Sequence, residues 1–148
     1  QCIGRKSTPV KNIIERGAVR NFAAAIGDLN PGYMDEELAK ATPHGRLIAP
    51  PTFPRTLDYG EIEGVQFPKE GLIHGEQFFH YNRPLYVGEV LYCYQQLMDV
   101  VEKEGKSGKM TIVIIHQFGE TEEKEQVFWA KRVTIVTEKV KEMYLNEN

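Results

Sequence analysis

The chain has 148 residues, a formal net charge of −3, 26% charged residues and 41% hydrophobic residues. This length suits one domain with a substantial core, and we expect a single domain over residues 1–148. The absence of a basic surplus argues against a nucleic-acid-binding surface. No apolar run approaches the roughly 20 residues that span a bilayer, and the first ten residues lack the apolar core of a signal peptide. The expected location is the cytoplasm.

Only two cysteines, Cys2 and Cys93, are present, so neither a disulfide framework nor a CxxC metal site is available. Cys93 lies in a strand-like run and is expected to be a small buried hydrophobe.

The first half of the chain favours helices. Residues 1–11 are polar and contain Pro9, which predicts a loose lead-in. An amphipathic helix is expected from Glu15 to Gly27 because its apolar residues follow helical spacing. These residues are Val19, Phe22, Ala23 and Ile26. The acidic residues 35–37 predict the start of a second, short helix, where the helix dipole favours negative charge.

Two proline-containing segments interrupt this half of the chain. The segment Gly27–Tyr33 reads GDLNPGY and consists mainly of turn residues, so its simplest interpretation is a helix cap followed by a turn. The second segment is Pro50-Pro51, which precedes TFPRTLDY. We predict a helix over Thr52–Tyr59, with Thr52 as its cap and Pro54 in its first turn, where proline is tolerated.

The second half of the chain favours strands, at about residues 73–81, 89–101, 109–118 and 126–137. The links between these runs are short and turn-like, which predicts an antiparallel meander. Helices followed by a sheet give an α+β fold. The simplest way to bury both is to wrap the sheet round the helix predicted at 52–59. The charged residues 139–148 are expected to form a flexible tail.

The order of an aromatic residue, small residues, Gly-Asp-Leu-Asn-Pro and an acidic helix start resembles the hydratase motif of the MaoC-like enoyl-thioester hydratases and dehydratases. A second block, HGEQFFHYNRPLYVGEVL at residues 74–91, is similar to the family's strand that ends in Arg-Pro before a turn with Val-Gly and an acidic residue. The resemblance covers about residues 14–136. It implies a hotdog fold, a curved antiparallel sheet wrapped round a central helix, and dimers that join sheets edge to edge.

In active members of that family, an Asp and a His five residues later hold the water that adds across the enoyl double bond. A backbone N–H of a His-Gly pair before the central helix stabilises the thioester oxygen. Here Asp28 matches the Asp and Asn30 matches the motif's Asn, but Tyr33 occupies the His position. A tyrosine with an unperturbed pKa of about 10 is a poor base at neutral pH. Pro50-Pro51 replaces His-Gly, and proline has no N–H to donate.

The resemblance therefore implies candidate catalytic positions at Asp28 and Tyr33, and candidate substrate-binding positions at Asn30, His44 and Pro51. With two parts of the site changed, the chain resembles the degenerate half of a two-part dehydratase. Such a half shapes the acyl pocket while a competent hotdog subunit performs the chemistry. The implied substrate is an acyl thioester of coenzyme A or an acyl-carrier protein, and the implied assembly is a homodimer or a heterodimer with a competent subunit. No cofactor, metal, nucleic acid or membrane is implied.

Three alternatives stay open. The chain could be an active homo-oligomeric hydratase that uses Asp28. It could be a hotdog thioesterase with a carboxylate near the central helix, for which Asp58, Glu61 or Glu63 are available. It could also be an acyl-binding module without turnover.

The four histidines have simpler interpretations than catalysis. His44 could replace the missing base, but Pro43-His44-Gly45 is typical of a loop. His74 and His80 have even spacing in a strand, which places both on one face, yet no third ligand is spaced for a metal. His116 lies on an alternating apolar face and is expected to be a core histidine.

Overall fold

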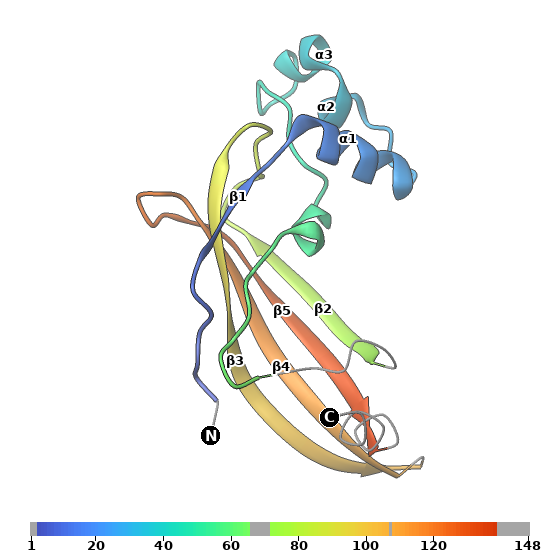
Figure 1. Ribbon diagram of the computed structural model, residues 1–148. Coiled ribbons are helices and arrows are strands. Elements are labelled where there is room, and N and C mark those ends of the chain that lie inside the picture. The colour runs from blue at the N-terminus through green and yellow to red at the C-terminus, as the bar shows by residue number, and fades with distance from the viewer. Residues whose placement is uncertain (1–2, 66–71, 107, 139–148) are drawn as a thin grey trace.

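The computed structural model describes residues 3–65, 72–106 and 108–138, which form helices above one end of a curved sheet (Figure 1). The sheet is antiparallel and has the strand order β1-β3-β4-β5-β2. Its strands are β1 (Val10–Ile13), β2 (Ile73–Tyr81), β3 (Val90–Gly105), β4 (Gly108–Glu120) and β5 (Gln126–Thr137). The predicted α+β hotdog fold is confirmed.

The predicted strands at 73–81 and 126–137 are confirmed at both ends, while β3 and β4 are longer than predicted. The two long strands extend to a tight connection in which Gly105 pairs with Gly108. Gly108 has a φ of 104°, a conformation that suits glycine.

The predicted meander is correct for β3, β4 and β5 and wrong for β2, which pairs with β5 at the opposite edge. The link between β2 and β3 does not turn back on itself. Instead, the N–H of Val87 donates to the Leu47 carbonyl at 3.1 Å, and the N–H of Ala49 donates to the Leu85 carbonyl at 2.9 Å. The link therefore pairs with residues 47–49 and carries the chain across the sheet.

The prediction of a loose lead-in is wrong for residues 3–11, which run along the edge of β3. The N–H of Gly4 donates to the Leu97 carbonyl at 2.7 Å, and the N–H of Ser7 donates to the Gln95 carbonyl at 2.8 Å. The predicted tail at 139–148 lies outside the described residues.

Three helices cover one end of the sheet: α1 (Arg16–Ala25), α2 (Pro31–Met34) and α3 (Glu36–Lys40). The amphipathic helix is confirmed, because α1 buries Val19 and Ala23 completely, although Ile26 after its end is exposed. The predicted short helix is α3. Its cap is Asp35, whose carboxylate accepts hydrogen bonds from the N–H groups of residues 37 and 38.

The helix predicted over Thr52–Tyr59 is reduced to η1, one turn of 3-10 helix at Phe53–Thr56. Leu57 already has extended dihedral angles. Beyond it, the Asn12 side chain accepts from the Asp58 N–H at 3.0 Å and donates to the Asp58 carbonyl at 2.8 Å. These two bonds hold Asp58 against β1 and occupy the groups that a continuing helix would need.

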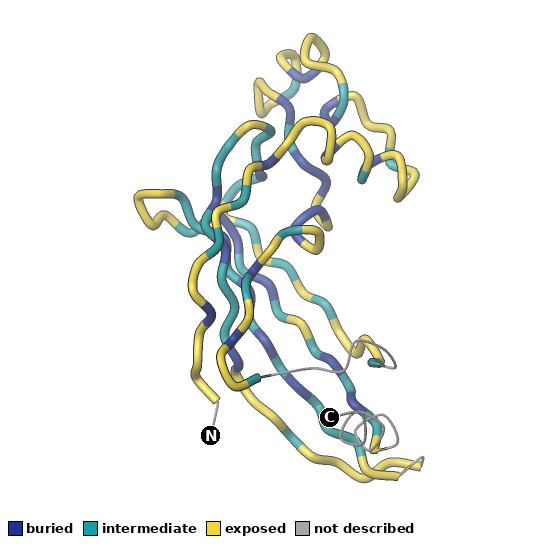
Figure 2. The backbone as a smooth tube through the Cα atoms, in the orientation of Figure 1, coloured by how far each residue is buried: buried dark blue, intermediate teal, exposed yellow. Residues whose placement is uncertain are grey.

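Buried side chains form two clusters against the sheet. The buried positions of β4 and β5 alternate, so these side chains share one side of the sheet, which we call the core face. Figure 2 marks the buried positions along the backbone. The larger cluster joins the sheet to α1, α2 and η1, with Phe22 packed edge-on against Phe53 at 5.6 Å. The smaller cluster lies farther along the sheet, where Ile62 packs with Leu97, Val113 and Ile115. An extended segment rather than a helix therefore covers that half of the core face.

Candidate functional site

The GDLNP segment forms the connection between α1 and α2. The N–H of Asp28 donates to the Ala23 carbonyl at 2.9 Å and so closes the end of α1. The Asp28 carboxylate accepts from the N–H of Asn30 at 3.3 Å. Asn30 in turn caps α2, because its side-chain oxygen accepts from the N–H of Gly32 at 2.9 Å. Asp28 and Asn30 therefore both perform the turn and cap roles that their residue types favour.

Asp28 and Tyr33 are brought together, as the motif resemblance implies for the Asp and His positions. Tyr33 lies on α2 with only 9% of its surface exposed and belongs to the larger core cluster. Burial, the charge of Asp28 and a hydrogen bond to Asp28 raise the pKa of the Tyr33 hydroxyl above its ordinary value. The hydroxyl therefore stays protonated beside Asp28 at neutral pH.

The Pro50-Pro51 pair lies where η1 begins. Pro50 is fully buried, and its carbonyl accepts from the N–H of Phe53 at 2.9 Å. Pro51 is exposed, and its carbonyl accepts a short hydrogen bond from the Tyr81 hydroxyl at the end of β2. Burial raises the pKa of Tyr81, which keeps that hydroxyl a donor. The pair therefore presents carbonyl groups that are already bonded and no N–H.

The contact between Tyr81 and Pro51 was not predicted. The sequence contains Tyr81 in a tyrosine-rich region, but no local signal links it to a position 30 residues earlier. The contact depends on the placement of β2, which the meander prediction missed.

His44 is exposed in the turn after α3, where the N–H of Gly45 donates to the Thr42 carbonyl at 3.0 Å. It is therefore placed in a loop, as its neighbours indicate. The thioesterase candidates are also at the surface. The Asp58 carboxylate accepts from the N–H of Gly60 at 2.9 Å, and Glu61 and Glu63 are exposed.

The prediction that His74 and His80 share a face is wrong, because β2 has an irregularity between His74 and Glu76. His74 pairs with the buried Thr134 on the core face, while His80 pairs with Trp129 on the other face. Among the described residues, no group of three or more His, Cys, Asp or Glu side chains is arranged to hold a metal ion.

His116 is not a core histidine, since it lies half-buried on the outer face of the sheet. Its ring is 5.0 Å from Trp129 and 6.2 Å from Phe118. Burial and the nearby Lys131 lower its pKa.

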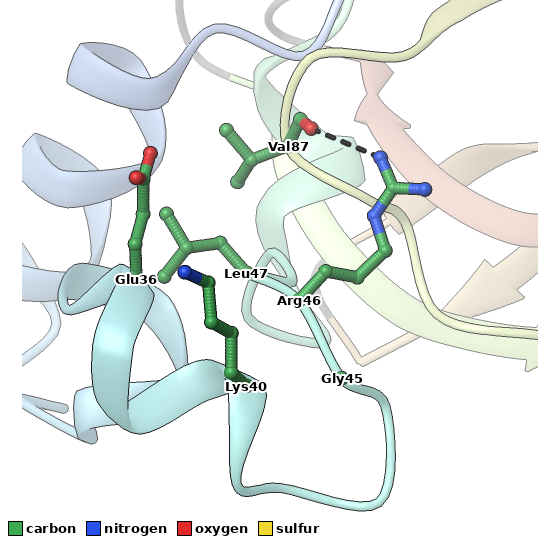
Figure 3. A pocket seen from close by; sticks show the side chains of 6 residues that line it. All are labelled: Glu36, Lys40, Gly45, Arg46, Leu47 and Val87. Carbon is green, nitrogen blue, oxygen red and sulfur yellow. Dashed lines mark hydrogen bonds between the residues drawn. The ribbon is translucent and has the colours of Figure 1, made fainter.

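A pocket of about 210 Å³ lies next to α3, and Asp28 does not line it (Figure 3). It is formed between α3, the loop that follows it and the link between β2 and β3. The side chains and backbone that line it belong to Glu36, Lys40, Gly45, Arg46, Leu47 and Val87. None of the five predicted site residues lines it.

No helix in the described part of the chain is long and apolar enough to cross a bilayer.

Relatives among curated proteins carry the name UPF0336 protein. A protein of Streptomyces griseus is 40% identical over 98 residues, which cover 60% of this chain and 64% of that protein. A protein of Saccharopolyspora erythraea is 34% identical over 110 residues, 70% of each chain. The chain thus spans somewhat less than two thirds of the length of the first of these relatives.

Solved structures share the fold at low sequence identity. A chain of the HadBC (3R)-hydroxyacyl-ACP dehydratase complex of Mycobacterium tuberculosis is 21% identical, with a TM-score of 0.73 over 92% of this chain and 98% of that one. The ChsH1–ChsH2 complex of the same organism gives 23% identity and 0.72 over 88% and 87%. The (R)-hydratase PhaJ1 of Pseudomonas aeruginosa gives 20% and 0.67 over 89% and 79%. These likenesses show the hotdog fold.

A family model described as the FAS1-like dehydratase domain region matches residues 1–130. This match covers the α1–α2 motif, the pocket and almost the whole sheet. The chain belongs to the family of FAS1-like dehydratase domains, as the resemblance to MaoC-like hotdog enzymes implies.

Proposed function

We propose that this chain is the non-catalytic half of a two-subunit dehydratase or hydratase that acts on 3-hydroxyacyl and enoyl thioesters. In this role it shapes the acyl pocket, while a hotdog subunit with an intact Asp–His pair moves the protons. The observation that carries the proposal is the buried Tyr33, which lies beside Asp28 at the position of the family's catalytic histidine. A general base must be deprotonated near the working pH. The raised pKa of Tyr33 works against that.

The oxyanion side of the site supports the same conclusion. An enolate oxygen needs donors that already point at it before the reaction. At this position Pro51 has no N–H, and its carbonyl accepts from Tyr81. Rotating the Pro51 peptide would break that bond without creating a donor.

The sheet edge supports a partner subunit. In the described sheet β2 is an outer strand, paired with β5 on one side. Its side chains include Ile73 and Phe78, which are 48% and 45% exposed. An edge strand with exposed apolar side chains is a liability unless another element pairs with it or covers it. Two of the solved structures with this fold are complexes of named subunits, HadBC and ChsH1–ChsH2.

The test measures hydration of crotonyl-coenzyme A, followed by loss of the enoyl-thioester absorbance. The purified chain is assayed alone and then together with a hotdog subunit from the same genome that carries the intact Asp–His motif. We expect no turnover by the chain alone and turnover by the pair that exceeds turnover by the second subunit alone. Turnover by this chain alone would contradict the proposal. Failure of the chain to raise the partner's activity would contradict it as well and would favour an acyl-binding module.

Asp28→Ala provides the matched variant for the assembled pair. If Asp28 only closes a turn, the rate of the pair should change by less than about threefold. Removal of a working acid–base group costs about 100-fold or more. A rate loss of that size would show that Asp28 acts as a catalytic acid or base.

A further inference from the structure

We infer that the pocket between α3 and the β2–β3 link binds the phosphate of a phosphopantetheine arm, with Arg46 as its principal cation. This inference rests on the proposed function, because phosphopantetheine is common to coenzyme A and acyl-carrier proteins. It assigns a binding role to a pocket that contains none of the motif residues.

The floor of the pocket is apolar and held in place by backbone hydrogen bonds. Leu47 is 5% exposed and, with Val87, forms this floor. The N–H of Val87 donates to the Leu47 carbonyl at 3.1 Å, and the next residue, Ile48, donates its N–H to the Gly32 carbonyl at 3.1 Å. The second bond ties the pocket to α2, the helix that carries Tyr33. The pocket and the motif therefore belong to one packed unit.

The charges around the pocket leave one cation in surplus. Glu36 at the rim is paired with Arg16 at 2.9 Å, and Lys40 is paired with Glu37 at 3.1 Å. Within the described part of the chain, Arg46 has no acidic partner. A ligand with negative charge would complete this arrangement, and one with positive charge would not.

Arg46 is also held in position. Its guanidinium lies 4.4 Å from the centre of the Tyr86 ring and donates to the Val87 carbonyl at 3.4 Å. Arg83 stacks on the same ring at 4.8 Å and is itself held by Glu89 at 2.8 Å. Stacking restrains the guanidinium, while one long hydrogen bond leaves most of its five donors available.

Lys40 can serve as a second donor. Figure 3 shows its ammonium group between Glu36 and Leu47, on the side of the pocket opposite Arg46. Its pair with Glu37 is exposed on both side chains, at 66% and 82%, and such a pair contributes little. The ammonium can therefore exchange Glu37 for a bound anion at small cost.

The size of the pocket fits a group rather than a whole cofactor. Its 210 Å³ is below the roughly 300 Å³ at which pockets for complete small ligands begin. A tetrahedral phosphate between two cations, with the gem-dimethyl carbon of the pantetheine arm against Leu47 and Val87, matches both the charge and the apolar floor. Arginine and lysine are the side chains that bind phosphate most readily.

The experiment titrates the purified chain with 4′-phosphopantetheine and with pantetheine by isothermal calorimetry. The two probes differ by the phosphate. We expect the phosphorylated probe to bind about tenfold more tightly, as a charge-assisted contact implies. Arg46→Gln should remove this preference and Lys40→Gln should reduce it. Arg20→Gln, which removes an exposed positive charge on α1 outside the pocket, should leave it unchanged.

Equal binding of the two probes by the unmodified chain would overturn the inference, as would a preference that survives Arg46→Gln. Inorganic phosphate as a competitor tests the apolar floor. If it binds as tightly as 4′-phosphopantetheine, the pocket holds phosphate alone and the assignment to the pantetheine arm is wrong. If it binds more weakly, competition by coenzyme A or by holo acyl-carrier protein identifies the carrier. Because these readouts are binding constants, they can fail while the crotonyl-coenzyme A assay supports the proposed function, and the reverse also holds.

Discussion

At the scale of single residues, Asp28 lies beside Tyr33, a tyrosine that cannot act as the general base of a hydratase. Burial and the neighbouring Asp28 raise the pKa of Tyr33, so its hydroxyl stays protonated. Tyr81 donates to the Pro51 carbonyl at the position where a backbone N–H would be required. Tyr33 thus occupies the position of the family's catalytic histidine, and Tyr81 binds the position where the family's glycine would offer its N–H. Neither tyrosine supplies the missing catalytic group.

Restoring the histidine alone should not restore hydration. We expect Tyr33→His to remain inactive toward crotonyl-coenzyme A, because Pro51 still offers no oxyanion donor. The double variant Tyr33→His with Pro51→Gly supplies both missing groups and is the informative comparison. Activity in the single variant, measured by loss of the enoyl-thioester absorbance, would show that the oxyanion donor comes from elsewhere.

Individual residues also mark the limit of prediction from sequence. The changes at Tyr33 and Pro51 are visible in the sequence, because each occupies a position with a known requirement. The partner that each one acquires depends on packing. Asp28 is close to Tyr33 along the chain and could be predicted as its neighbour, whereas Tyr81 reaches Pro51 through the course of the whole sheet.

At the scale of elements, local patterns predict helices and strands well until a distant side chain competes. The strand-like runs between turn-like links correctly predict the ends of β2 and β5. The helix predicted over 52–59 has a suitable start, but Asn12 binds the backbone of Asp58 from 46 positions away. The local sequence pattern of residues 52–59 gives no sign that Asn12 will take the backbone groups of Asp58, so the predicted helix is too long.

The hairpin of β4 and β5 depends on a glycine that local patterns do not single out. A Cβ atom on Gly119 would overlap the ring of Phe128, which is completely buried. We expect Gly119→Ala to lower the free energy of unfolding by about 1–3 kcal/mol, the usual cost of overpacking. Urea denaturation measures the change.

Gly17→Ala is the matched control for this substitution. Gly17 lies in α1, its added Cβ would meet nothing within 4 Å, and alanine favours helix. We expect this variant to be as stable as the unmodified chain or slightly more stable. Equal effects at Gly119 and Gly17 would show that Phe128 can move aside.

At the scale of the whole molecule, one cysteine and three tyrosines with raised pKa values make folding sensitive to alkali. Burial raises the pKa of Cys93 and of Tyr94 to about 12 each, and it raises the pKa of Tyr59 and Tyr81 as well. In the unfolded chain these groups titrate at their ordinary values, about 8.5 for cysteine and 10 for tyrosine. Above those values the unfolded state binds fewer protons than the folded state, so stability falls as the pH rises.

We therefore expect the free energy of unfolding to decline from about pH 9 upward. Urea denaturation at a series of pH values measures it, and tyrosinate absorbance reports the titration in the folded state. A folded chain in which all tyrosines titrate near pH 10, with no loss of stability, would contradict this expectation.

The order of strands along the chain also has a consequence for synthesis. Because β2 pairs with β5, Gln77 contacts Lys131 across 54 positions. The N-terminal segment lies along β3, where Ser7 contacts Gln95 across 88 positions. Contacts this distant in sequence slow folding, because the chain must close long loops before they form. The three-strand unit of β3, β4 and β5 can assemble from neighbours, and the two outer strands must wait for it. On the ribosome, the backbone of β2 therefore lacks its partner strand until the end of the domain emerges, and this interval is when the nascent chain is most exposed to aggregation.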